Sequence, residues 1–223
     1  MGFVQLNASN NASLTRVLTE SFKLLPKVTD AGYTGYGDLG QGFAGFFIKP
    51  NSTVQAFNET FAGFFNLTQL PGIQGTVAAF PSTWDGYREQ FLKDPHIGSN
   101  VQDISRLLTR DVINRKSEDL ARFIVKNGAG GGFNFSECRW QFLNCQNTDY
   151  SAVGKINNDE RNNTAVNDIW KHSHALLGIS VDWANNATQS EKHKKRQHAV
   201  QISEALTKIV GSEGGTYTNE ANP

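Results

Sequence analysis

The chain has 223 residues, and its 21 basic and 21 acidic side chains cancel, so the formal net charge is zero. A neutral chain lacks the positive electrostatic field that attracts nucleic acids and anionic membranes, so we expect neither as a partner. No apolar run approaches the roughly 20 residues that a membrane-spanning helix needs. The length suits one domain with a sizeable core, so we expect a single domain over residues 1–223.

The first part of the chain predicts two helices separated by two strands. A helix is expected over residues 11–25, because apolar side chains recur there at the spacing of one helix face before Pro26 ends the pattern. The stretch 32–50 mixes glycine with aromatic residues and predicts two strands, the second over residues 43–49, joined by a turn near 38–40. A second helix is expected to begin after an N-cap at Asn51 or Ser52.

The rest of the chain predicts two strands, three helices and an irregular segment. In chain order, the patterns predict a strand at 72–80, a short helix at 82–94, a helix from Ser117 to Asn127, an irregular surface segment at 138–164, a long strand at 172–183, and a last helix with a capping box at Thr188 and Glu191. This order favours an α+β fold, in which helices pack on one face of an antiparallel sheet.

The glycine run GAGGGF at residues 128–133 does not predict a nucleotide site. A dinucleotide-binding loop follows a strand and begins a helix, whereas here a helix precedes the glycines and FNF follows them. We interpret the run as the end of a helix leading into a strand.

Strand periodicity sorts the side chains of the segment 172–183. Alternate residues from Ala175 to Trp183 are apolar, so this side is expected to meet the helices. The opposite side carries His172, His174, Leu176, Gly178, Ser180 and Asp182. We interpret that open face either as a solvated surface or as the floor of a pocket, in which Gly178 leaves room for a ligand.

Asn-X-Ser/Thr sequons are unusually frequent in this chain. Eight occur where chance pairing would give about three, and this acceptor motif is typical of secreted glycoproteins. They begin at Asn7, Asn11, Asn51, Asn58, Asn66, Asn134, Asn162 and Asn186. The sequons favour a secretory-pathway ancestry over a chance excess, although the start MGFVQLNASNN lacks the pattern of a signal peptide.

Cysteine and histidine spacing indicates no metal site. Cys138 and Cys145 are seven residues apart, which suits either a small loop-closing disulfide or two free buried thiols. His193 and His198 lie five apart, on different faces of a helix. The run EKHKKRQH, at residues 191–198, predicts a solvated helix face or a docking surface for an acidic partner.

Four stretches, taken together, resemble the substrate-binding domain of berberine-bridge-enzyme-like FAD-linked oxidases of the fungal type. The final residues 205–223, ALTKIVGSEGG followed by TYTNEANP, are similar to a helix and a Tyr-X-Asn-Glu-X-Asp-Pro segment of that family. Residues 23–37, 48–65 and 164–183 are similar to further helix and strand segments in the same order. The chain departs from the pattern at Asn222, where the family has aspartate, and at Lys171, where it has arginine.

The resemblance implies an antiparallel sheet that forms the floor of a pocket beneath the flavin ring. Tyr217 and Asn219 would then lie near the flavin or the substrate. The flavin-binding domain of the family has no counterpart in this sequence, so no cofactor is expected on this chain unless that domain is supplied with its FAD.

Three functions remain open at this point. The first is a flavin-independent cyclisation or isomerisation of a natural-product intermediate, in which a pocket holds a reactive chain in a folded shape. The second is a partial chain, or one half of a split FAD-dependent oxidase, that needs the missing flavin domain. The third is a non-catalytic small-molecule-binding or structural protein. The expected partners are a small-molecule intermediate and either a second copy of the chain or the missing flavin domain. The expected catalytic residues are His174, Asp182 and Tyr217, and the expected substrate-binding residues are Tyr33, Tyr36, Phe46, His172, Ser180 and Asn219.

Overall fold

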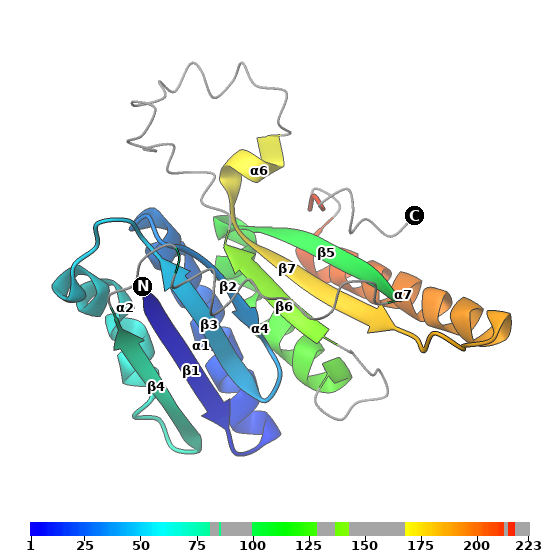
Figure 1. Cartoon of the computed structure of the whole chain (residues 1–223), viewed down its shortest axis with the longest axis horizontal. Helices are drawn as coiled ribbons and strands as arrows, with labels where there is room; N and C mark the ends of the chain where they lie inside the picture. The colour runs from blue at the N-terminus through cyan, green and yellow to red at the C-terminus, as the bar shows by residue number, and fades with distance from the viewer. Residues whose placement is uncertain (81–84, 86–99, 129–136, 143–167, 212–213, 217–223) are drawn as a thin grey trace.

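A computed structural model describes residues 1–80, 85, 100–128, 137–142, 168–211 and 214–216 (Figure 1). Its strands are β1 (Gly2–Ala8), β2 (Thr34–Asp38), β3 (Gly42–Ile48), β4 (Ile73–Ala79), β5 (Val101–Thr109), β6 (Glu137–Phe142) and β7 (Ser173–Asp182). Its helices are α1 (Asn11–Asp30), α2 (Val54–Leu67), α4 (Arg110–Gly128), α6 (Asp168–His172) and α7 (Gln189–Val210).

The seven strands form one antiparallel sheet in the order β4-β1-β3-β2-β6-β7-β5. Helices α1, α2, α4 and α7 lie on one face of this sheet (Figure 1). We call this the helix face, and the opposite face the open face. The α+β fold predicted from the sequence, with helices on one face of an antiparallel sheet, is confirmed.

An aromatic cluster joins α2 to the sheet and forms much of the core. Phe57 and Phe61 of α2 stack with ring centroids 4.2 Å apart, and Phe61 meets Phe47 of β3 edge-on at 4.7 Å. Phe64 stacks on Phe43 at 5.3 Å. All five rings are at most 2% exposed, so each contributes close to its full hydrophobic stabilisation.

Two helix boundaries differ from the sequence prediction. Helix α1 continues past Pro26 to Asp30, because the inward spacing continues through Val28 and Thr29, both buried. This burial offsets the hydrogen bond that a proline removes from a helix interior. Helix α4 begins at Arg110 and not at Ser117, whose hydroxyl donates to the Ile113 carbonyl inside the helix.

The predicted N-cap of α2 is wrong by one residue. Thr53, and not Asn51 or Ser52, accepts a hydrogen bond from the Ala56 amide at 3.1 Å. The capping box of α7 is confirmed, since Thr188 and Glu191 exchange backbone and side-chain hydrogen bonds.

Three strands of the sheet differ from the sequence prediction. The sequence patterns did not predict β1 or β5, and β6 occupies the start of the segment expected to be irregular. The short helix at 82–94, the glycine run, and the pairing of Cys138 with Cys145 lie outside the residues described here.

Replacing Phe61 by alanine is expected to lower the free energy of unfolding by about 3–5 kcal/mol, because it removes a buried ring and leaves a cavity. Val54→Ala, on the same helix but 58% exposed, should change it by no more than about 0.5 kcal/mol. Urea denaturation of the two variants measures both values. Equal losses would show that the aromatic cluster does not carry the core.

Candidate functional site

An apolar row of side chains crosses the open face of the sheet. Strand register places Phe3 opposite Phe46, and Phe46 opposite Tyr36. The row then crosses Gln141 of β6, its one polar position, and continues with Leu176 opposite Leu107. The rings of Phe3 and Phe46 are 4.9 Å apart, and those of Tyr36 and Phe46 are 6.3 Å apart. The three aromatic residues are half-buried, so their rings keep surface available to a ligand.

Polar groups lie beside this row, on β5 and β7. The hydroxyl of Ser180 donates to the Asp103 carboxylate at 2.5 Å, across a directly opposed pair of strand positions. The next open-face pair is Ser105 opposite Gly178, where the glycine carries no side chain over the sheet. A carboxylate is therefore held on the open face two pairs along β5 from Leu107 of the apolar row, with Ser105 and Gly178 between them.

The segment 214–216 runs along the outer edge of β5. The Leu107 amide donates to the Gly215 carbonyl at 2.8 Å, and the hydroxyls of Ser105 and Thr216 are 2.8 Å apart. A side chain at Gly215 would lie 2.5 Å from a methyl of Ile169 and 3.0 Å from Leu107, so this close approach requires glycine. The segment is thus fixed to the edge of the open face immediately before Tyr217.

The predicted orientation of His174 is wrong, because β7 begins with an irregularity. Thr109 pairs with Ser173 while Leu108 pairs with Ala175, so one extra residue of β7 stands unopposed. Such a bulge shifts the alternation of side chains by one position. His174 therefore lies against α1, fully buried, with its Nδ1 2.5 Å from the Thr29 hydroxyl.

Burial keeps the His174 imidazole neutral. Desolvation is the main reason that its pKa is lowered to about 4; the positive charge of Arg110 lowers it further, and Asp30 opposes the shift. Its Nε2 is buried and has no hydrogen-bond partner in the described part of the chain. A protonated ring would leave that second N–H unsatisfied, which agrees with the direction of the pKa shift.

The other predicted site residues separate into two groups. Tyr36, Phe46 and Ser180 lie on the open face, as expected. Tyr33 does not, because it immediately precedes β2 and packs into the core, with its ring 5.1 Å from that of Phe61 and its hydroxyl 2.6 Å from that of Ser52.

Two of the remaining predicted residues lie at the ends of elements, and two lie outside the residues that the structure describes. His172 is exposed at the end of α6, and Asp182 is exposed at the end of β7. Asp182 lines a hollow of about 720 Å³ together with Trp183 and Lys194. Tyr217 and Asn219 lie outside the described residues, so their predicted roles stay predictions.

Sequence reasoning missed Phe3, Asp103, Ser105 and Thr216. Three of them lie in strands or segments that the patterns did not predict. The alternation Val101, Asp103, Ser105, Leu107 against Gln102, Ile104, Arg106, Leu108 is a weak signal, because both sides mix polar and apolar residues. Only pairing with β7 identifies the open side.

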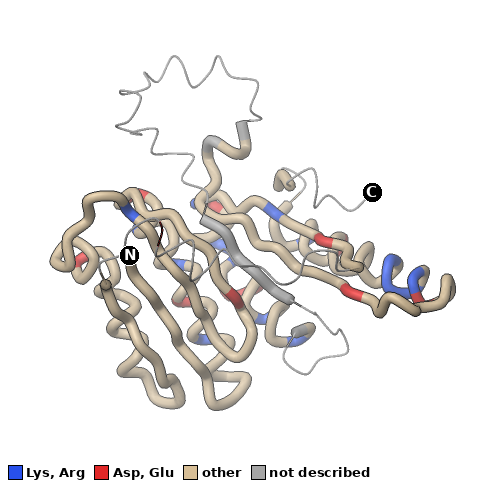
Figure 2. Tube along the Cα trace, in the orientation of Figure 1, with Lys and Arg blue, Asp and Glu red and all other residues tan. Residues whose placement is uncertain are grey.

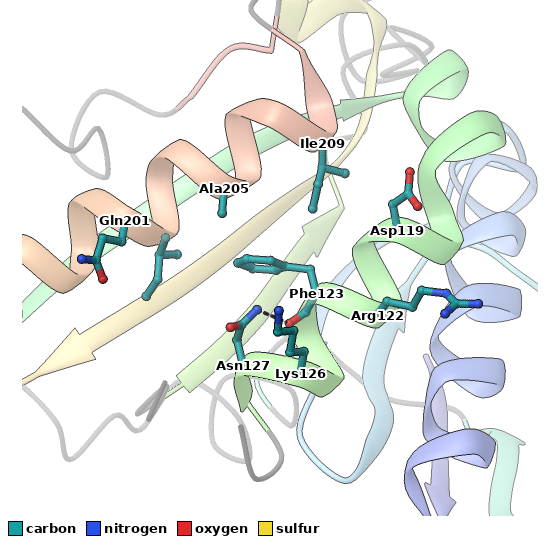
Figure 3. A pocket seen from close by; sticks show the side chains of 9 residues that line it. Asp119, Arg122, Phe123, Lys126, Asn127, Gln201, Ala205 and Ile209 are labelled. Atoms are coloured by element: carbon teal, nitrogen blue, oxygen red, sulfur yellow. Dashed lines mark hydrogen bonds between the residues drawn. The ribbon is translucent and has the colours of Figure 1, made fainter. Parts of the chain in front are cut away.

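Two features of the helix face lie away from this site. A groove of about 390 Å³ separates α4 from α7, with Phe123 pointing toward Ala205 and Ile209 (Figure 3). The basic run occupies the first half of α7, where Lys194 and Arg196 are exposed (Figure 2). Arg196 also lies over the Trp183 ring, 5.9 Å from its centroid.

The part of the chain that the structure describes contains no cluster of three or more metal-ligating side chains of the His, Cys, Asp or Glu type. Within the same residues, no helix is long and apolar enough to cross a bilayer.

No protein-family model matches this chain. A curated relative, an uncharacterised FAD-linked oxidoreductase of Arthroderma benhamiae, is 36% identical over 232 aligned residues, which cover 100% of this chain and 38% of the relative. This chain is thus similar to one part of an FAD-linked oxidoreductase, and it spans well under half the length of that relative.

Solved structures of a flavoprotein and of two further enzymes share the fold. The VAO-type flavoprotein MtVAO615 of Myceliophthora thermophila has a TM-score of 0.76 at 17% identity, over 99% of this chain and 40% of that protein. A carbohydrate oxidase of Microdochium nivale has a TM-score of 0.59 at 17% identity, over 99% and 46%. Berberine bridge enzyme of Eschscholzia californica has a TM-score of 0.50 at 11% identity, over 98% and 43%.

The buried His174 predicts a pH-dependent stability. Its pKa of about 4 lies below the ordinary 6.5, so the unfolded state binds the proton first, and stability is complete above about pH 6.5 and falls as the pH approaches 4. The loss should reach about 3 kcal/mol. His174→Gln should flatten this slope in urea denaturation between these pH values, whereas His172→Gln, at an exposed position, should not. An unchanged slope in His174→Gln would contradict the assignment.

Gly215→Ala is expected to loosen segment 214–216, because the new methyl group would overlap the side chain of Ile169. Hydrogen exchange of the Leu107 amide, which bonds to the Gly215 carbonyl, should accelerate at least about tenfold, equivalent to about 1.4 kcal/mol of local opening. Gly40→Ala is the matched control, since nothing lies within 4 Å of its added methyl group. Equal protection of Leu107 in both variants would show that the segment does not depend on this contact.

Proposed function

We propose that this chain forms the substrate-binding part of an FAD-linked oxidoreductase, and that the open face is the wall against which an organic substrate lies. The observation that supports this most strongly is the open face itself, because three half-buried aromatic rings share one sheet surface with a hydrogen-bonded carboxylate further along β5. Such a surface combines a large apolar contact area with a few polar groups that fix orientation, as small-molecule sites do.

The chemical character of the open face suits a flat heteroaromatic ring. The half-buried rings of Phe3, Tyr36 and Phe46 offer apolar area to a planar partner, and the neighbouring polar groups offer hydrogen bonds to its edge. FAD, when bound, supplies the electron acceptor for the oxidation. The rest of the FAD molecule is proposed to bind to a domain in a longer protein or in a partner chain. This agrees with the fact that the chain covers 38% of the curated relative.

Asp103 is the residue that we assign to proton transfer in this function. Its carboxylate lies on the open face and accepts a hydrogen bond from the Ser180 hydroxyl, with 2.5 Å between the two oxygen atoms. An acceptor atom is therefore held in a defined orientation. A substrate that extends from the row past Gly178 would bring a hydroxyl or amine to this carboxylate, which would accept its proton. Asp182 remains a second acidic candidate at the end of the strand, and Tyr217 and Asn219 keep the contact roles that the resemblance implies.

A flavin-independent cyclisation or isomerisation of a natural-product intermediate is the second candidate. It is favoured by one observation, namely that this chain alone assembles the aromatic row. A conjugated chain held across the row would be kept in a reactive folded shape. His174 cannot polarise it, because its ring lies beneath the sheet against Thr29.

A chimera tests the oxidoreductase proposal. This chain replaces the aligned segment of the Arthroderma benhamiae relative, and the purified chimera is expected to show the visible absorption band of bound flavin. Tyr36→Ala and Phe46→Ala should retain the band but shift its maximum, because they change the surface facing the ring. Val54→Ala, on the outer side of α2, is the control and should leave the spectrum unchanged.

Two outcomes would contradict this proposal. One is a flavin-loaded chimera whose spectrum is insensitive to both open-face variants. The other is a chain that converts a conjugated polyene without any flavin band, which would favour the cyclase.

A further inference from the structure

Helix α2 carries two sequons within a single helix. They are Asn58-Glu59-Thr60 and Asn66-Leu67-Thr68, the second of which reaches the C-cap. Asparagine and threonine are both poor helix formers, and asparagine costs up to about 0.7 kcal/mol relative to alanine in a helix interior. Three such residues, Asn58, Thr60 and Asn66, lie within this 14-residue helix and therefore need an explanation.

Two other sequons have a structural explanation. Thr53 and Thr188, the hydroxyl residues of the sequons at Asn51 and Asn186, are the N-caps of α2 and α7. Asparagine and threonine both recur in turns and helix caps, so a sequon can arise there for structural reasons alone. Asn58 and Thr60 lie in the helix interior, which offers no such reason; the second sequon ends at the C-cap, and its case rests on the exposure of Asn66.

The side chains of Asn58 and Asn66 have no structural partner. Both are exposed, and neither amide forms a hydrogen bond within the described chain. The inward side of α2 is formed instead by Phe57, Phe61 and Phe64, which are at most 2% exposed. The two asparagines thus lie on the outer surface of the helix, where an attached group would meet solvent.

We propose that Asn58 and Asn66 are N-glycosylation sites, so that the outer surface of α2 carries two N-linked glycans. The donor is an oligosaccharide on a lipid diphosphate. The Asn Nδ2 attacks the anomeric carbon of the sugar, the carbon–oxygen bond to the diphosphate breaks, and the lipid diphosphate leaves with the electron pair while the amide loses one proton.

The placement leaves the candidate site free. Eight residues along a helix correspond to about 12 Å and about 80° of rotation, which separates the two glycans on the outer side. Helix α2 packs on the helix face, beside β4 and α1, and away from the open face (Figure 1). In the assembled protein, the outer side of α2 must consequently remain in solvent, and any flavin-binding portion must dock elsewhere.

The test is expression of the chain in a eukaryotic host behind a secretion signal, followed by peptide-N-glycosidase F treatment and peptide mass spectrometry. Thr60→Ala and Thr68→Ala remove the sequon hydroxyl but keep the asparagine. Each is expected to abolish the glycan at Asn58 or Asn66 respectively. Thr76→Ala, an exposed threonine outside any sequon, should change neither.

The attachment precedes folding, so variants that fold poorly still report on the sites. Unmodified Asn58 and Asn66 would overturn the proposal, provided that glycosylation in the host is active. Glycans on the other sequons, or on a co-secreted reporter glycoprotein, show that it is. The proposal is also independent of the flavin chimera, since modification of α2 requires neither a cofactor nor an intact open face.

Discussion

The burial of one face of a seven-stranded antiparallel sheet is the constraint on which the rest of the structure depends. Side chains alternate along a strand, so covering one face with helices commits every second residue to the core. Val4 and Leu6 of β1, Phe43 and Phe47 of β3, and Ile179 of β7 are all at most 1% exposed. A register slip of one residue would move these groups to the open face, so the hydrophobic core also fixes which residues are available to a ligand.

The sequence predicts this arrangement where the helical or strand periodicity of side chains continues. The prediction is wrong where that periodicity is interrupted. The helical spacing of α1 is clear enough to predict the helix but not its passage through Pro26, which depends on tertiary burial of Val28. Parity assigned Ser180 correctly, yet it misplaced His174, because a bulge cannot be recognised from alternation in one strand. Phe3 was missed because its role depends on β3, a partner strand distant in sequence.

One buried cation connects the sheet to the last helix. Arg106 of β5 is 9% exposed and donates to the Ser203 and Thr207 hydroxyls of α7 and to the Ser105 carbonyl. Burial lowers the pKa of its guanidinium, but an arginine remains charged at neutral pH. Neutral oxygen acceptors thus stabilise this charge, and they hold the second half of α7 against the strand that also bears Asp103.

The same strand therefore has two different tasks on its two faces. On the helix face, Arg106 fixes β5 to α7; on the open face, Asp103 and Ser105 hold Ser180 and Thr216. Because adjacent residues of a strand cannot rotate independently, the contact with α7 also orients the carboxylate on the opposite face. A polar site at the edge of a sheet would otherwise be among its least ordered parts. Anchoring from beneath is what makes β5 a credible wall of a binding site.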